Sequence, residues 1–259
     1  MTVITRDFIN PNIIFEDIHV NTEYSYVDLS KKIDIFKNIL EKYINKNGKQ
    51  TRIVIGFFPS LEQIACLFAC FELGITVCII DYQRPDNFIQ FTYTDPKTEL
   101  MSPIDIFIVG SKRDTDKFRY FERVCKNTIV LSEIKSLPCG VNKKVLANEE
   151  TVIIKCTSSG TTDTPKIIEH SHKFMYNLAV RNSNFYDKSV FIAYNLNHGS
   201  SFATYFLPAL YSKQVTKIVN VLNFLKKRTI EYCTKADHIM IPYNTQIARF
   251  FELGSYSNT

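Results

Sequence analysis

Short apolar runs rich in β-branched residues alternate along this chain with segments whose apolar residues recur at helical spacing. The clearest case is an apolar run at 52–58, a helical segment at 61–73 that Gly74 ends, and a second apolar run at 75–80. A strand, a helix and a strand so close together form a βαβ unit with parallel strands and a right-handed crossover. The alternation predicts an α/β fold of mostly parallel sheets with helices on both faces.

The same alternation extends through the rest of the chain. We expect an early strand pair within 12–26, further strands at 104–109, 128–131, 151–154, 189–193, 214–219 and 238–241, and helices at 27–47, 114–126, 171–181, 200–211, 223–235 and 244–253, with a short helix near Phe88. Ser171 is the expected N-cap of the helix at 171–181. Residues 166–169 are placed to form the returning arm of a hairpin.

The stretch 136–150 breaks this pattern, because it contains Pro138, Gly140, two lysines and two glutamates without a clear period. We therefore divide the chain into a first α/β subdomain at 1–135, a connection at 136–150, and a second α/β segment at 151–259.

Composition excludes several classes of protein. With 45% hydrophobic and 22% charged residues in 259, the chain resembles a folded protein with a substantial core, not a disordered one. The formal charge of +5 comes from cations scattered among acidic residues, so it does not indicate a nucleic-acid partner. The sequence predicts neither a membrane span nor a signal peptide, since it has no long uncharged apolar run.

Cysteines and histidines do not form a metal-binding pattern. The seven cysteines include no C-x-x-C pair, and Cys66 and Cys70 share one face of an apolar helix. We expect buried free thiols and a reducing, cytoplasmic compartment. His170 and His172 would share a face of a strand, but no thiol or carboxylate completes a site, and adjacent acids such as Glu149-Glu150 are usually solvated. We predict no metal site.

A polar loop follows the strand at 151–154. Its hydroxyl and backbone N–H groups, the close backbone approach that glycine permits and one lysine charge could together hold a triphosphate. The candidate phosphate-binding residues are Ser158, Ser159, Gly160, Thr161, Thr162 and Lys166. A solvated Ser/Thr/Pro connection is the alternative, and the loop lacks the G-x-x-x-x-G-K-S/T spacing of a Walker A loop.

A second loop contains His198 and Gly199, after the strand at 189–193. Both loops follow strands, and ligands of parallel sheets bind outside the carboxyl ends of the strands. The imidazole of His198 would therefore face a ligand cleft; a surface or helix-capping histidine is the alternative.

Four stretches together resemble the AMP-forming adenylating enzymes, the superfamily of acyl-CoA synthetases, luciferases and peptide-synthetase adenylation domains. Residues 158–166, SSGTTDTPK, resemble the phosphate loop S/T-S-G-S/T-T-G-x-P-K-G of that family. Residues 71–81 are similar to its A-G-A-x-x-x-P-I-D turn, 24–29 to its T-Y-x-E-L opening, and 197–199 to its F-H-x-x-G stretch. The four occur in the family's order, and the resemblance implies the N-terminal part of the acyl-adenylating fold.

The resemblance implies a reaction in which a carboxylic acid attacks the α-phosphate of ATP, with Mg²⁺, to give an acyl adenylate and pyrophosphate. A thiol such as that of coenzyme A then takes the acyl group. Ser158, Ser159, Gly160, Thr161 and Thr162 would bind the β- and γ-phosphates and Lys166 would balance charge. By the same resemblance, His198 and Gly199 would lie near the acyl substrate.

The chain departs from the family pattern in two ways. Asp163 and Ile167 replace glycines, which places a carboxylate beside a polyanion and stiffens the turn. The sequence, which ends at Thr259, also lacks the adenine-binding Y-G-x-T-E, the ribose-binding T-G-D, a hinge and a C-terminal catalytic lysine. We therefore hypothesise a truncated or split AMP-dependent ligase, inactive without a second polypeptide that carries these motifs. The alternative is a degenerate, non-catalytic binding protein that retains the fold.

Overall fold

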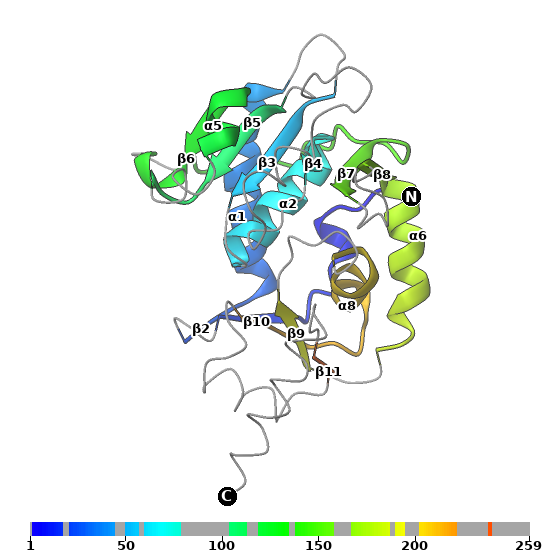
Figure 1. The fold of residues 1–259 in the computed structure, drawn as a ribbon. Coiled ribbons are helices and arrows are strands. Elements are labelled where there is room, and N and C mark those ends of the chain that lie inside the picture. Colours follow the sequence, from blue (N-terminus) through cyan, green and yellow to red (C-terminus); the bar gives the residue numbers. More distant parts are fainter. Residues whose placement is uncertain are drawn as a thin grey trace, which may run out of the picture.

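The computed structural model describes residues 2–17, 21–44, 50–56, 60–78, 104–112, 119–134, 138–157, 167–186, 190–194, 202–221 and 238–239. These residues form two sheets with helices packed between them (Figure 1). One buried cluster joins side chains of both sheets, such as Phe15 and Ile106, with side chains of the helices, such as Phe68 and Leu210. The two sheets therefore share a hydrophobic core.

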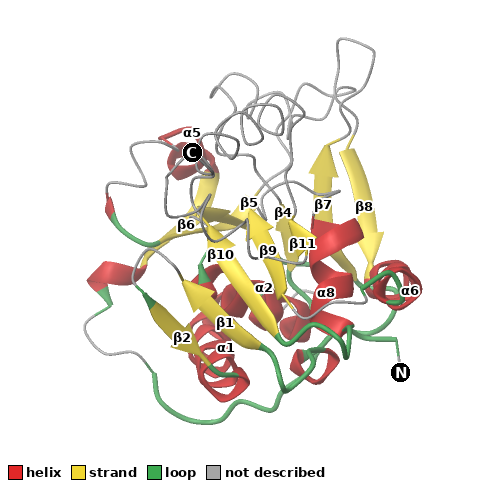
Figure 2. Cartoon of the chain, turned by 90° about the horizontal axis from the view of Figure 1, so that it is seen from below, coloured by secondary structure: helices red, strands yellow, loops and turns green. Residues whose placement is uncertain are grey.

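The larger sheet, sheet B, contains six strands in the order β6-β5-β3-β4-β7-β8. Figure 2 shows β7 and β8 side by side at one end of this sheet. Its strands are β3 (Arg52–Gly56), β4 (Thr76–Cys78), β5 (Ile104–Val109), β6 (Cys125–Val130), β7 (Val152–Thr157) and β8 (Ile167–Ser171). All neighbours are parallel except β7 and β8, which are antiparallel. The predicted α/β fold with mostly parallel sheets is confirmed.

Sheet A has the order β11-β9-β10-β1-β2. Its strands are β1 (Ile14–Asp17), β2 (Thr22–Tyr24), β9 (Val190–Tyr194), β10 (Lys217–Val221) and β11 (His238–Ile239). Only the β1–β2 pair is antiparallel among them. Each sheet takes strands from both sides of residues 136–150, and the division of the chain into subdomains stays a prediction.

The predicted βαβ unit is present as β3, α2 (Leu61–Leu73) and β4, with β3 and β4 paired in parallel. The side chain of Ser60 accepts a hydrogen bond from the Gln63 amide at the start of α2. Gly74 ends the helix with φ of 69°, a left-handed conformation that glycine adopts without strain. The glycine of the stretch similar to A-G-A is thus a helix C-cap.

The other long helices begin at polar caps. In α1 (Tyr26–Leu40), Ser25 and Asp28 form a reciprocal capping box. The stretch similar to T-Y-x-E-L therefore forms the N-terminal cap of this helix. Ser171 caps α6 (His172–Ser183) as predicted, by accepting from the Phe174 amide. The shorter helices are η1 (Arg6–Phe8), η2 (Glu41–Tyr43), α5 (Arg119–Val124), η3 (Leu131–Glu133), the π-helix η4 (Phe202–Phe206) and α8 (Leu207–Tyr211).

Three expectations need correction. The helix predicted to reach residue 126 ends at Val124, because parallel pairing of Cys125 with Ile104 draws the following residues into β6. Within the helix predicted at 200–211, the described residues form the π-helix η4 followed by α8. Cysteines 66, 70, 78 and 156 are buried as expected, but Cys139 lies exposed in the connection and Cys125 is half-buried.

The predicted helices near Phe88 and at 223–235 and 244–253, together with Cys233, lie outside the described residues. Within the described ranges, no helix has the length and apolar character that crossing a membrane would require.

Candidate functional site

The predicted phosphate loop is carried by the β7–β8 hairpin of sheet B. Because β7 runs parallel to β4, with Val77 opposite Ile154, Thr157 lies at the carboxyl edge of the sheet. β8 returns antiparallel with Ile167 opposite Thr157, so the predicted hairpin is confirmed. Thr157 and Ile167, which flank 158–166 in the sequence, therefore lie at the edge where parallel sheets bind ligands.

The residues expected to contact ligands lie outside the described residues: Ser158, Ser159, Gly160, Thr161, Thr162, Lys166, His198 and Gly199. Their roles stay predictions. The strand before His198 is β9, which is parallel to its neighbours β10 and β11, so residues 195–200 follow a strand at the carboxyl edge of sheet A.

Two charges of opposite sign flank the base of the predicted loop. Lys155 on β7 lies directly opposite Glu169 on β8, and their side chains form an ion pair. A lysine amine and a carboxylate so paired leave this part of the hairpin electrically neutral. Lys155 is thus already paired, and the expected role of Lys166 would add a further positive charge from the loop.

Ile167, which stands where the family pattern has glycine, is accommodated as a strand residue. It is half-buried, begins β8 and pairs with Thr157 in the ladder. A β-branched side chain is well suited to this position, so the replacement extends the hairpin by regular pairing.

The thiols near this edge are kept protonated. Burial raises the pKa of Cys78, at the end of β4, to about 12, and also raises the pKa of Cys156 on β7. Thiolates are the reactive form of cysteine, so neither residue is suited to nucleophilic chemistry. Among the described residues, no group of three or more His, Cys, Asp or Glu side chains is placed to hold a metal ion.

His170 and His172 do not share a strand face. The ring of His170 stacks on Phe174 at 4.8 Å between centroids, whereas His172 is fully buried as the first residue of α6. Nδ1 of His172 accepts from the Ile4 amide at 3.0 Å, so Nε2 carries the proton and donates to the Phe71 carbonyl at 3.1 Å. Burial lowers the pKa of His172 to about 4, which keeps the ring neutral.

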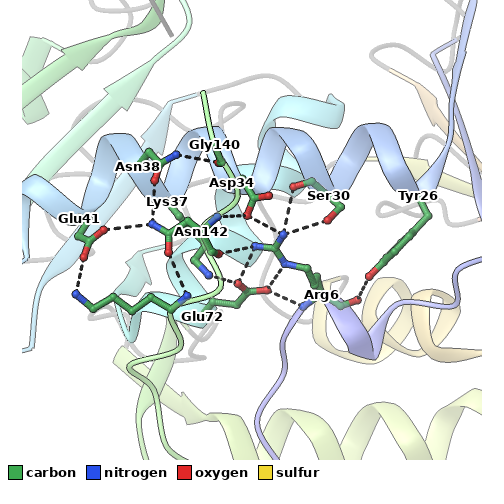
Figure 3. Close-up of polar contacts among 11 residues, drawn as sticks. Arg6, Tyr26, Ser30, Asp34, Lys37, Asn38, Glu41, Glu72, Gly140 and Asn142 are labelled. Carbon is green, nitrogen blue, oxygen red and sulfur yellow. Dashed lines mark hydrogen bonds and ion pairs between the residues drawn. The ribbon is translucent and has the colours of Figure 1, made fainter. Parts of the chain in front are cut away.

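A buried ionic cluster lies at the opposite, amino edge of sheet B (Figure 3). Glu72, in the last turn of α2, accepts from the Arg6 amide at 2.9 Å, from Arg6 Nε at 2.9 Å and from Lys37 Nζ at 2.5 Å. Arg6 Nη1 also pairs with Asp34 at 2.8 Å. Burial alone would raise the pKa of Glu72, but the hydrogen bonds from Arg6 and Lys37 lower it below its usual range.

A pocket of about 750 Å³ lies beside this cluster and is lined by Thr5, Arg6, Asp7, Tyr26, Val27, Ser30, Lys31, Asp34, Glu72, Val141, Lys143 and Val145. The cluster and the pocket were not foreseen from the sequence. The sequence does contain one indication of the cluster, because Lys37 and Glu72 are charged residues on mostly apolar helix faces.

Solved structures with the same fold are acyl-CoA synthetases and related enzymes. ATP-bound MatB from Rhodopseudomonas palustris aligns at 15% identity with a TM-score of 0.69, over 89% of this chain and 46% of that one. The Brucella canis acyl-CoA synthetase aligns at 13% identity with a TM-score of 0.67, over 89% and 44%. The N-terminal domain of Mycobacterium tuberculosis FACL13 aligns at 12% identity with a TM-score of 0.70, over 89% and 58%.

These similarities define the fold as that of the N-terminal part of acyl-adenylating enzymes. The chain spans about half the length of the solved structures that it matches. Among curated proteins, none matches the sequence significantly. The sequence model described as AMP-binding enzyme matches residues 10–237, and the chain belongs to this family.

Proposed function

We propose that this chain provides the ATP-phosphate-binding part of an AMP-forming ligase, which activates a carboxylic acid as an acyl adenylate. The observation that carries the proposal is the β7–β8 hairpin: Thr157 and Ile167, the residues on either side of 158–166, are paired at the carboxyl edge of a mostly parallel sheet. Membership of the AMP-binding family supports the same chemistry, and one solved structure of the same fold is an ATP-bound enzyme.

In this proposal the loop binds and orients phosphate, and the chain contributes no covalent step. Hydroxyl and backbone N–H groups of Ser158, Ser159, Gly160, Thr161 and Thr162 donate to the β- and γ-phosphate oxygens. The ammonium of Lys166 offsets their charge. Mg²⁺ bound together with the triphosphate would supply further positive charge to the pyrophosphate leaving group.

His198 and Gly199 lie on the acyl side of the site in this proposal, and coenzyme A is a candidate acceptor of the acyl group. A second polypeptide, or a further segment of the same one, supplies the groups that hold adenine and ribose. We place the protein in the cytoplasm, where ATP and reduced thiols are abundant.

Calorimetry with Mg·ATP tests the phosphate-binding role directly. Lys166→Ala removes one charge-assisted contact and should weaken binding at least about tenfold. Lys173→Ala is the matched control, because Lys173 is an exposed lysine paired with Glu149 and Glu150 near the far end of the hairpin. Equal affinities of the two variants would contradict the assignment of the loop.

Pyrophosphate exchange tests the ligase activity. Exchange is measured with ATP and a panel of carboxylic acids, with and without a polypeptide that carries the Y-G-x-T-E and T-G-D motifs. Exchange that requires both polypeptides supports a split ligase. Absence of exchange in both mixtures, together with no binding of ATP by a folded chain, favours a non-catalytic protein that retains the fold. Asp163, which stands where the family pattern has glycine, supports this alternative.

A further inference from the structure

The N-terminal segment 2–8, here called the N-terminal strap, is fastened at the amino edge of sheet B by Glu72 of α2 and by His172. The Ile4 amide binds His172, which in turn binds the Phe71 carbonyl. Two residues further along the strap, Arg6 binds the carboxylate of Glu72 through its main chain and its guanidinium. The strap therefore joins the last turn of α2 to the start of α6.

His172 uses both ring nitrogens for this purpose. The ring is fully buried and meets the ring of Phe71 edge-on at 6.1 Å between centroids. The main-chain amide of His172 donates to the Thr151 carbonyl, one residue before β7. His172 thus contacts the strap, α2 and Thr151 on the β7 side of the hairpin base, and it directly follows Ser171, the last residue of β8.

The hairpin base needs such contacts, because its ladder is irregular there. Val152 pairs with Ser171, but the register shifts between Val152 and Ile154. The Val152 carbonyl accepts from the side chains of Gln50 at 2.5 Å and Thr76 at 2.8 Å, which fix it from the sheet. His172 fixes the same base from the side of α2.

We propose that His172, in its neutral form, is a positioning residue for the β7–β8 hairpin: it ties the hairpin base to α2 and to the N-terminal strap. The strand register transmits this position to Thr157 and Ile167, at the ends of the predicted phosphate loop. The expected effect of His172 on nucleotide binding rests on the proposed function. The part concerning the hairpin itself rests only on the contacts of His172.

Three variants separate the hydrogen bond between His172 and the Ile4 amide from the one between His172 and the Phe71 carbonyl. His172→Phe keeps a ring and removes both nitrogens. His172→Asn keeps an oxygen near the position of Nδ1, which can accept from Ile4, and His172→Gln keeps an amide near Nε2, which can donate to the Phe71 carbonyl. His170→Asn is the control, because His170 lies two residues away, stacks on Phe174 and is outside these contacts.

Hydrogen exchange of the folded, ligand-free chain is the primary measurement. In His172→Phe, amides of the strap and of strands β7 and β8 should exchange at least about tenfold faster, while those of β1 and β10 are unchanged. The Asn and Gln variants should each recover part of this protection. Faster exchange confined to the strap, or a uniform increase across both sheets, would overturn the proposal.

Calorimetry with Mg·ATP then measures the effect on the loop, with an expected loss of about tenfold in affinity for His172→Phe and little change for His170→Asn. If the unmodified chain binds no ATP, the proposed function fails, but the exchange measurement still decides the role of His172. If His172→Phe does not fold, the Asn and Gln variants are compared with the control, and hairpin protection equal to the control's in both overturns the proposal.

Discussion

Removal of the Glu72 carboxylate should destabilise the fold more than removal of any surface acid. The side chain of Glu72 is 2% exposed and that of Lys37 is 0% exposed, and the two are joined at 2.5 Å. Glu72→Ala deprives a buried ammonium of this counter-charge, whereas Arg6 keeps its ion pair with Asp34. Breaking a buried ion pair from one side costs about 3–5 kcal/mol, because the remaining charge stays away from water.

Urea unfolding followed by circular dichroism measures this loss as a lower midpoint at unchanged slope. Glu62→Ala is the matched control, since Glu62 lies on the same helix and pairs with Lys32 at 2.7 Å, but the side chains of Lys32 and Glu62 are 31% and 43% exposed. Exposed pairs contribute about 0–1 kcal/mol. The double variant Lys37→Met with Glu72→Gln should recover much of the stability, because no unpaired ammonium is then buried.

The reasoning would be refuted if Glu72→Ala cost no more than Glu62→Ala. A double variant no more stable than Glu72→Ala would show that Lys37 is not the reason for the cost.

Three further predictions concern other parts of the chain. The pKa of His172 is about 4 in the folded chain against an ordinary 6.5, so the unfolded chain takes up the proton first as the pH falls. The stability that depends on the neutral ring is complete above pH 6.5 and is lost toward pH 4, by about 3 kcal/mol in total. Urea titrations at several pH values should show a smaller loss of stability over this range in His172→Gln. Gly56→Ala should destabilise the fold by about 1–3 kcal/mol in the same assay, because its Cβ would lie 2.7 Å from Val109 Cγ1. Asp163→Gly should strengthen binding of Mg·ATP by removing a carboxylate beside phosphate, and unchanged affinity in calorimetry would count against a working loop.

Much of the fold follows from local patterns. The helix at Leu61–Leu73 was predicted with its actual bounds because Ser60 and Gly74 specify its two ends, and the strand at Ile104–Val109 because its apolar run is unbroken. The boundary between α5 and β6 was misplaced because pairing of Cys125 with Ile104 depends on a residue distant in sequence. Helix-end devices are local, whereas strand ends are set by neighbouring strands.

The candidate site divides in the same way. The hairpin after β7 could be predicted, since apolar runs flank a polar loop, and it is present. The ionic cluster could not be assembled from sequence, because Arg6, Lys37 and Glu72 come from three separate elements. Their charge at apolar helix positions predicts only that each has a partner, not which one.

Glu72 of α2 binds the N-terminal strap directly, whereas its neighbour Phe71 is linked to the strap through His172, and the two should differ in what they control. The Glu72 carboxylate meets Arg6 and Lys37, and the other contacts of Arg6 lie on α1 and at Asn142, away from the β7–β8 hairpin. Its loss should therefore lower the folded fraction and leave nucleotide affinity per folded molecule unchanged. The Phe71 carbonyl meets His172 at the hairpin base, so loss of that contact should change hairpin protection and affinity together. Stability and binding measured side by side in Glu72→Ala and His172→Phe therefore distinguish a residue that supports the whole fold from one that positions the hairpin.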